Sequence, residues 1–348
     1  MTDAGSTPDP LPPVRALPPA YNRHDGSDGE VAQALTALVA GVPWARLSWS
    51  GLVAELATLG RSDIPLARLA EGHVDALRSA DQAGVTLVPD ALYGVWASRS
   101  LATGLTAREA DGGWRLDGTL RFASGTGVLD RALVPALLAD GPAVLVDLPV
   151  AGLPADTSAW RTRAMAVSRS HVVRVLDRPV PRDAAVGPPG FYLQRPGFFP
   201  GGVGVAAVWA GGLCRVVDLV LGWLGPRRWP AGELRLGRLW TRRATALALV
   251  TQAGQRLDGL LTPDARPRHA YPAVLLQQVS TLARAGVAEA VLAGLDEVRG
   301  LAGPAGLAFD LDLTRAVDDL DLYVRQQNAD ADAAFLGSTL RDAVTPAT

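Results

Sequence analysis

Lysine is absent from the 348-residue sequence, so all 33 of its Lys/Arg positions are arginine, and isoleucine occurs only at Ile64. Ala, Gly, Pro, Arg and Leu dominate instead. This bias is typical of a GC-rich genome, so the abundance of arginine says little about binding partners. Against 35 Asp and Glu residues the formal net charge is −2. Because nucleic-acid-binding proteins usually carry a strongly basic face, this balance predicts no nucleic-acid partner.

Residues that could form disulfides or metal sites are scarce. The single cysteine, Cys214, excludes an internal disulfide framework and a cysteine-based metal site. The four histidines lie far apart in the sequence, without the HxxxH or HExxH spacing of a metal centre, at His24, His73, His171 and His269. We therefore expect no bound metal.

The chain also lacks a recognisable export or membrane signal. Its start has neither the basic residues nor the apolar core of a signal peptide, and residues 1–25 are expected to be a disordered tail. The most apolar run, Gly202–Leu224, is interrupted by Arg215 and Asp218, which predicts a buried helix and not a membrane span. We expect a cytoplasmic protein.

The clearest local signal lies in the stretch Trp114–Gly127. Asp117-Gly118 sits between two short runs in which apolar and polar residues alternate. This pattern predicts a β-hairpin with a two-residue turn at Asp117-Gly118, because both central residues of such a turn need a positive φ. The second strand would lead into residues 124–127, which read Ser-Gly-Thr-Gly. Their hydroxyls and bare backbone amides suit the close approach of a flat polar ligand.

The periodicity of apolar residues changes twice along the chain and divides it into three parts. Helical spacing covers residues 26–84, short alternating runs cover 85–190, and long helical patterns cover 191–348. The predicted fold class is α+β, with an N-terminal helical domain, a middle β-barrel or sandwich and a C-terminal bundle of long helices.

Individual elements follow from the same patterns. Helices are predicted at Glu30–Ala40, Leu47–Leu59, from Ser62-Asp63-Ile64-Pro65 to Asp81, Gly201–Leu224, Glu233–Leu260, Ala273–Ala302 and Asp312–Gly337. Besides the hairpin, strands are predicted at Val85–Val88, Tyr93–Ser98, Leu101–Arg108, Arg131–Leu138, Ala143–Leu148, Met165–Ser168 and Val172–Leu176. The segment 303–306, Gly-Pro-Ala-Gly, is the expected break between the last two helices.

Two short motifs match known patterns only in part. Gly202-x-Gly204-x-x-Ala207 resembles a dinucleotide fingerprint, but no strand precedes it, so small residues for close helix packing explain it better. Ser168 and Ser170 precede His171, but neighbours along a strand point to opposite faces, which argues against a hydrolytic triad.

Polar residues elsewhere have simpler explanations than catalysis. Asp310-x-Asp312 lacks the glycine and closing glutamate of a calcium loop, and helix N-terminal charge explains it. His73 falls on or beside an apolar helical stripe, where a packed, hydrogen-bonded histidine is favoured over a ligand contact.

The three-part order and the central stretch resemble the acyl-CoA dehydrogenase superfamily of flavoproteins. Trp114–Gly118 and Phe122–Gly125 are similar to that family's W-R-L-(N/D)-G…F-x-(S/T)-G segment, and Trp96-Ala97-Ser98 lies where an earlier strand contributes a second hydroxyl motif. The resemblance implies FAD as cofactor, with the Ser124 hydroxyl bonded near flavin N5. It assigns cofactor binding to Trp96, Ser98, Phe122, Ser124, Gly125 and Arg235.

The chain departs from the family pattern at two functional positions. Glu233–Gly237 keeps the glycine of the family's Arg-x-x-Phe-Gly motif, which reaches the FAD of a neighbouring subunit, but places its arginine at Arg235. Alignment on Asp319–Tyr323 puts Gln327 where the family has its catalytic glutamate. A glutamine side chain cannot act as a general base at neutral pH. Either Asp330 or Asp332 replaces the glutamate, or the protein does not abstract an α-proton.

Three functions follow from this resemblance. The first is α,β-dehydrogenation of an acyl-CoA or related thioester, with flavin N5 accepting the hydride and passing electrons to an acceptor. The second is a flavin-dependent monooxygenase or oxidase of the same fold, which would use oxygen. The third is a non-catalytic homologue that serves as a subunit of a complex, motivated by the missing glutamate. The resemblance also implies a homo-oligomer.

Overall fold

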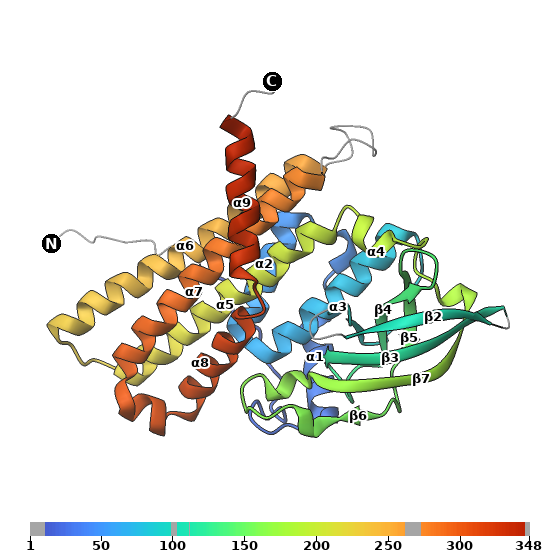
Figure 1. Cartoon of the computed structure of the whole chain (residues 1–348). Helices are drawn as coiled ribbons and strands as arrows, with labels where there is room; N and C mark the ends of the chain where they lie inside the picture. Colours follow the sequence, from blue (N-terminus) through green and yellow to red (C-terminus); the bar gives the residue numbers. More distant parts are fainter. Residues whose placement is uncertain (1–10, 99–102, 111, 262–272, 345–348) are drawn as a thin grey trace.

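A computed structural model describes residues 11–98, 103–110, 112–261 and 273–344. It confirms the predicted α+β class, with N-terminal helices, a curled middle sheet and a C-terminal helical bundle. In Figure 1 the sheet lies on one side of the central helix α3 (Ile64–Ala83), and the long helices run side by side on the other. Because α3 contacts both β1 and α5, it joins the two parts.

The N-terminal helices begin where the sequence provides capping side chains. Helix α1 (Asp28–Val39) starts with a capping box formed by Ser27 and Glu30, and α2 (Trp49–Ser62) starts at Ser48. Helix α3 starts at Asp63, whose carboxylate accepts a hydrogen bond from the Leu66 amide, and it ends at a left-handed Gly84. These side chains satisfy backbone groups that the helix ends leave unpaired.

The middle part is one seven-stranded mixed sheet. Its strands are β1 (Tyr93–Val95), β2 (Gly104–Ala110), β3 (Gly113–Ala123), β4 (Arg131–Leu138), β5 (Val144–Pro149), β6 (Ala155–Asp156) and β7 (His171–Pro181). They are ordered β1-β4-β2-β3-β7-β6, and β5 pairs with β4. Strand β4 pairs in parallel with both β1 and β2, and the other pairs are antiparallel.

The predicted hairpin turn at Asp117-Gly118 is wrong, because these residues lie inside the continuous strand β3. The register with β7 shifts between Leu116 and Gly118, and the Asp117 carboxylate accepts a hydrogen bond from the Asp177 amide. Gly118 has a φ of 148°, and a Cβ there would lie 2.2 Å from the Gly104 carbonyl oxygen. The dipeptide therefore marks an irregularity in a central strand, where glycine permits close backbone approach.

Three other strand predictions need correction. Val85–Val88 has no regular secondary structure, and residues 166–168 form a short 3₁₀ helix instead of a strand. Strand β1 ends at Val95, short of the predicted Ser98. Residues 101–102, at the start of the predicted strand Leu101–Arg108, lie outside the described residues.

Six helices of the described chain form the C-terminal part. They are α4 (Phe191–Gln194), α5 (Phe198–Leu224), α6 (Pro230–Leu261), α7 (Ala273–Phe309), α8 (Leu311–Val324) and α9 (Ala329–Val344). The predicted break at residues 303–306 is a kink inside α7, where Gly303 has non-helical dihedral angles. The predicted single helix Asp312–Gly337 is instead two helices. Asn328 separates them, and its side chain accepts a hydrogen bond from the Ala331 amide, as an N-cap does.

Helix α5 is long and apolar enough to cross a membrane by composition, yet 78% of its most apolar window is buried inside the protein. It packs against α2 through small residues. A Cβ on Gly211 would lie 2.0 Å from the Ala57 carbonyl oxygen, and one on Gly60 would lie 2.3 Å from that of Val208. Gly202 and Gly204 similarly allow close contact with side chains of α7 and α2, which agrees with the packing role predicted for them.

Candidate functional site

A cavity of about 650 Å³ lies between the sheet and the helices, and we call it the sheet–bundle cavity. One wall comes from the chain after β1, the end of β3 and the loop before β7. The other comes from α3, α8 and the turn after α8. Its lining residues are Arg68, Val95, Ala97, Ser98, Phe122, Ser124, Trp160, Met165, Ser170, Leu322, Tyr323, Arg325 and Gln326.

Most of the predicted cofactor-binding residues meet at this cavity. Ser98, Phe122 and Ser124 line it directly. Trp96 is buried beside it and donates a hydrogen bond from its indole Nε1 to the Ser124 carbonyl oxygen at 2.8 Å. Gly125 follows Ser124, and its amide donates to the Ser168 carbonyl oxygen at 2.8 Å. The structure thus brings together five residues that the sequence placed up to 29 positions apart, from Trp96 to Gly125.

Backbone strain is concentrated around the cavity. Phe122, Met165 and Arg169 are non-glycine residues with positive φ, at 56°, 55° and 47°. Such conformations are unfavourable for residues with a side chain and cluster at functional sites. Phe122 is 45% exposed as a residue, and its ring packs edge-to-face on Trp160, with ring centroids 6.3 Å apart.

Three buried serine hydroxyls form a row at the floor of the cavity, which we call the serine row. The Ser124 Oγ lies 2.8 Å from the Ser170 Oγ, which in turn lies 2.8 Å from the Ser168 Oγ. The Ser168 hydroxyl donates to the Met165 carbonyl oxygen at 2.7 Å. The sequence does not predict this row, because the pattern of Met165–Ser168 indicates a strand, whereas residues 166–168 form a 3₁₀ helix. The left-handed conformation of Arg169 instead lets both serine hydroxyls meet.

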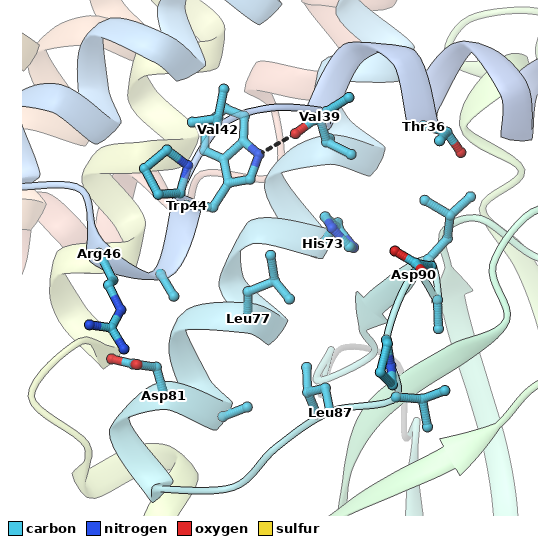
Figure 2. Close-up of a pocket in the computed structure, with 18 of the residues that line it drawn as sticks. Thr36, Val39, Val42, Trp44, Arg46, His73, Leu77, Asp81, Leu87 and Asp90 are labelled. Carbon is cyan, nitrogen blue, oxygen red and sulfur yellow. Dashed lines mark hydrogen bonds between the residues drawn. The ribbon is translucent and has the colours of Figure 1, made fainter.

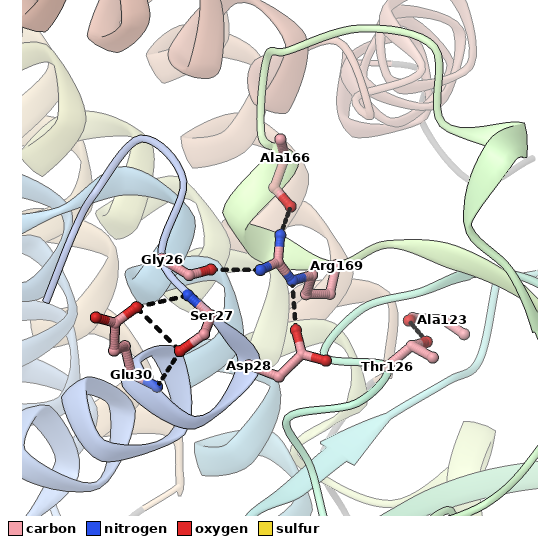
Figure 3. Close-up of polar contacts among 8 residues, drawn as sticks. All are labelled: Gly26, Ser27, Asp28, Glu30, Ala123, Thr126, Ala166 and Arg169. Atoms are coloured by element: carbon pink, nitrogen blue, oxygen red, sulfur yellow. Dashed lines mark hydrogen bonds and ion pairs between the residues drawn. The ribbon is translucent and has the colours of Figure 1, made fainter.

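Arg169 fastens the serine row to the start of α1 (Figure 3). Its Nε donates to the Asp28 carboxylate at 2.8 Å, and its two terminal nitrogens donate to the carbonyl oxygens of Gly26 and Ala166. The Arg169 carbonyl oxygen also accepts a hydrogen bond from the Thr126 amide at 3.2 Å. Arg169 therefore connects the first helix and the loop before β7 through its side chain, and the segment after β3 through its backbone carbonyl.

The helical wall of the cavity is basic and aromatic. Arg68 forms an ion pair with Glu71 at 2.8 Å, and Arg325 forms one with Asp321 at 3.0 Å. The buried Tyr323 hydroxyl has no well-oriented hydrogen-bond partner among the described residues, and the Gln326 side chain is a nearby polar group. Burial raises the pKa of Tyr323, so the hydroxyl stays protonated and can donate a hydrogen bond.

The described residues that line the cavity include no carboxylate. Gln326 lines the cavity, whereas Gln327, at the position of the family base, turns its side chain to Asp332 and donates to it at 2.9 Å. Asp332 lines a different cavity, next to α5 and α7, and Asp330 is exposed. The substitution of Asp330 or Asp332 for the family glutamate therefore receives no support from the geometry within one chain.

Arg235 lies away from the sheet–bundle cavity, on α6. Its guanidinium forms an ion pair with Glu297 of α7 at 2.8 Å, and it remains 38% exposed. It does not line the cavity of its own chain. Its assignment to a cofactor of a neighbouring subunit stays a prediction.

Asp319, a buried carboxylate of α8, supports the cavity from behind. Its Oδ1 accepts a hydrogen bond from the Met165 amide, which fixes the loop that carries Met165 into the cavity. Burial raises the pKa of Asp319 to about 7, against the opposing effects of the Met165 amide and Arg315. The sequence offered no signal for this role, because Asp319 belongs to a run of acidic residues that predicts a solvated helix face.

His73 lies in a separate hollow of about 730 Å³, between the end of α1, α3 and residues 85–92 (Figure 2). Its Nδ1 accepts a hydrogen bond from the Tyr93 amide at 3.1 Å. Burial lowers the pKa of His73 to about 4, so the ring is neutral at physiological pH. This contact agrees with the packed, hydrogen-bonded histidine predicted from the sequence. The described residues also contain no group of three or more His, Cys, Asp or Glu arranged to hold a metal ion.

No protein-family model and no curated protein matches the sequence. Solved structures do resemble it. XiaF from Streptomyces sp., in complex with FADH2 and glycerol, is 19% identical, covers 92% of this chain and 89% of its own, and has a TM-score of 0.73. TdsC from Paenibacillus sp., with FMN and indole, is 16% identical over 92% and 90% of the two chains, with a TM-score of 0.74.

The methanesulfinate monooxygenase MsuC from Pseudomonas fluorescens is similar in the same way. It is 15% identical, covers 92% of this chain and 90% of its own, and has a TM-score of 0.72. At such identities the likeness concerns the fold, and it extends over nearly the whole chain. The protein therefore has the acyl-CoA dehydrogenase-like fold that the resemblance of its three-part order and of its Trp114–Gly125 segment implied.

Proposed function

We propose that the protein is a flavin-dependent monooxygenase that binds reduced flavin in the sheet–bundle cavity and oxygenates an organic substrate. The observation that carries this proposal is the cavity's composition: hydroxyls and aromatic rings on the sheet side, arginines on the helix side, and no carboxylate among the described lining residues. Two proteins of similar fold are known in complex with a flavin, XiaF with FADH2 and TdsC with FMN.

The lining residues fit a flavin. A volume of about 650 Å³ is within the range of cavities that bind cofactors and drug-sized ligands. Phe122 and Trp160 present aromatic surface for a flat ring system, and the Ser124 and Tyr323 hydroxyls have hydrogen-bonding capacity to offer. Arg68 and Arg325 supply positive charge for an anionic isoalloxazine or phosphate.

A bound reduced flavin would supply two electrons to dissolved oxygen, so that one oxygen atom enters the substrate and the other leaves as water. The protein's own residues bind and orient. Trp96 fixes the Ser124 carbonyl, Ser124 would hold the flavin edge near N5, and Tyr323 can donate a hydrogen bond from the helical wall. Both FAD and FMN remain candidates, and FAD is the one that the sequence resemblance implies.

Thioester dehydrogenation is the less favoured alternative. It needs a base that removes an α-proton. Glu71 and Asp321 are paired with the lining arginines Arg68 and Arg325, and Asp319 accepts a hydrogen bond from the lining residue Met165. Burial raises the pKa of both Glu71 and Asp319, but neither side chain lines the cavity, where a base would have to reach a substrate.

The test is a pair of measurements on the purified full chain. Oxidised and dithionite-reduced FMN and FAD are titrated anaerobically, followed by oxygen consumption with reduced flavin and a panel of aromatic and sulfur-containing compounds. The proposal predicts tight flavin binding and product with one added oxygen atom. Bleaching of the oxidised flavin complex by octanoyl-CoA without oxygen would instead establish dehydrogenation, and absence of any flavin binding would favour the complex-subunit hypothesis.

A further inference from the structure

The serine row has a direction, which follows from counting its hydrogens. Each serine hydroxyl carries one hydrogen and two acceptor lone pairs. A backbone carbonyl can only accept, so the Ser168 hydrogen goes to the Met165 carbonyl oxygen. Ser168 must then accept the hydrogen of Ser170, and Ser170 must accept the hydrogen of Ser124. With its hydrogen used, Ser124 presents only lone pairs to the cavity.

The reverse direction is less favourable by one hydrogen bond. If Ser124 turned its hydrogen to the cavity, Ser170 would donate to Ser124 and Ser168 to Ser170. The Ser168 oxygen would then face the Met165 carbonyl oxygen at 2.7 Å without a hydrogen between them. The Phe122 carbonyl oxygen does not change this balance, because at 3.5 Å it is too far from the Ser124 Oγ for a good hydrogen bond.

The surrounding backbone holds the row in place. The Gly125 and Thr126 amides donate to the carbonyl oxygens of Ser168 and Arg169, which ties the two serine-bearing segments together. All three serines are at most 9% exposed, so water has little access to supply a competing partner. The direction of the row is therefore a fixed property of the cavity floor.

We propose that the serine row makes Ser124 a dedicated hydrogen-bond acceptor and thereby selects the reduced form of the flavin over the oxidised form. This inference rests on the proposed function. A reduced isoalloxazine carries a hydrogen on N5 and can donate it, whereas the oxidised ring offers a lone pair there. A hydrogen-bond acceptor that faces N5 is paired when the ring is reduced, because N5 carries a hydrogen. When the ring is oxidised, the same acceptor faces a second lone pair and stays unpaired. Ser168 and Ser170 are then positioning residues that act through Ser124.

The size of the selection follows from one hydrogen bond. A net hydrogen bond corresponds to at most about tenfold in an equilibrium constant. The wild-type protein should therefore bind reduced flavin up to about tenfold more tightly than this pocket would without the row. For a two-electron couple, tenfold corresponds to a rise of about 30 mV in the midpoint potential of the bound flavin.

The decisive variant is Ser168→Ala. It removes the acceptor of the Ser170 hydrogen, so the remaining pair can point either way and Ser124 regains the freedom to donate. The Met165 carbonyl keeps its bond from the backbone amide of residue 168, so the loop is preserved. Ser170→Ala should act in the same direction. Ser79→Ala is the matched control, because Ser79 is a buried serine of α3 outside the row.

The experiment measures dissociation constants of oxidised and dithionite-reduced FMN and FAD anaerobically, together with the midpoint potential of the bound flavin. We expect Ser168→Ala to lower the ratio of oxidised to reduced dissociation constants severalfold, up to about tenfold, and to lower the potential accordingly. Ser79→Ala should leave both at wild-type values.

Equal binding of the two redox forms by the wild-type protein would overturn the inference while leaving flavin binding intact. An unchanged ratio in Ser168→Ala would also overturn it. If the wild-type protein binds neither redox form, the proposed function itself fails, and this inference fails with it.

Discussion

Replacement of Asp319 by asparagine should change how the stability of the protein depends on pH. Asparagine keeps the oxygen that accepts the Met165 hydrogen bond and removes the ionisable group. Burial raises the pKa of Asp319 to about 7, whereas an aspartate in the unfolded chain titrates near 3.9. Between these two values the folded protein binds the proton more tightly, so this group makes stability fall as pH rises.

The magnitude follows from the two pKa values. By linkage, the ionisation of Asp319 changes the free energy of unfolding of the wild type by about −1.5 kcal/mol at pH 5 and about −4 kcal/mol at pH 8. The conversion uses about 1.36 kcal/mol per pKa unit. The free energy of unfolding of Asp319→Asn minus that of the wild type should thus grow by about 3 kcal/mol from pH 5 to pH 8. The constant part of the difference depends on the amide's own contacts and does not enter the test.

Urea unfolding at pH 5, 6, 7 and 8 measures this difference. Subtracting the wild-type curve cancels the other titrating groups, including His73, whose lowered pKa makes stability rise with pH between about 4 and 6.5. Asp330→Asn, the same substitution at an exposed position, is the control variant. A difference for Asp319→Asn that stays constant or shrinks toward pH 8 would refute the buried-carboxylate reasoning.

Three further predictions concern packing and support of the cavity. Arg169→Met removes the guanidinium bonds to α1 and should cost about 1–3 kcal/mol in urea unfolding and weaken flavin binding; unchanged unfolding would show that these bonds are not retained in solution. Gly211→Val should destabilise the protein by several kcal/mol or prevent folding, because α2 lies against that position. Gly222→Ala, on the open face of α5, should be neutral or stabilising by about 0.5–1 kcal/mol. Equal thermal unfolding of the two variants would contradict the packing. Trp96→Phe leaves the buried Ser124 carbonyl without its indole donor and should cost about 1–3 kcal/mol, so a wild-type unfolding curve would count against that contact.

The sequence predicted the layers of the fold because apolar periodicity reflects burial, and burial is what packs helices on a sheet. It failed where tertiary contacts override local preference. Gly118 was predicted as a turn because Asp-Gly favours one, yet pairing with β2 and β7 on both sides keeps β3 continuous through it. Val85–Val88 is strand-like in composition but pairs with none of the strands in the described part of the chain.

The residues of the candidate site also divide into those that the sequence predicts and those that depend on tertiary contacts. Ser98, Phe122 and Ser124 could be predicted because they lie in or beside motifs that resemble a known family. The contact between Ser168 and Ser170 could not be predicted, because it depends on the left-handed conformation of Arg169. No pattern of side chains predicts a positive φ at an arginine. The role of Asp319 depends on a contact 154 positions away in the sequence, which residue spacing cannot encode.

That distant contact has a consequence for how the protein is made. The loop at Met165 obtains its partner only when α8 has been synthesised, and Arg169 reaches back 141 positions to Asp28. Contacts so widely separated in the chain form slowly, because the entropy of closing the intervening loops must be lost first. On the ribosome, the sheet can pair its strands early, but the helical wall of the cavity and the Asp319 contact to Met165 wait for nearly the entire polypeptide. A nascent chain that stalls before residue 311 would therefore present an unfinished pocket to chaperones and proteases.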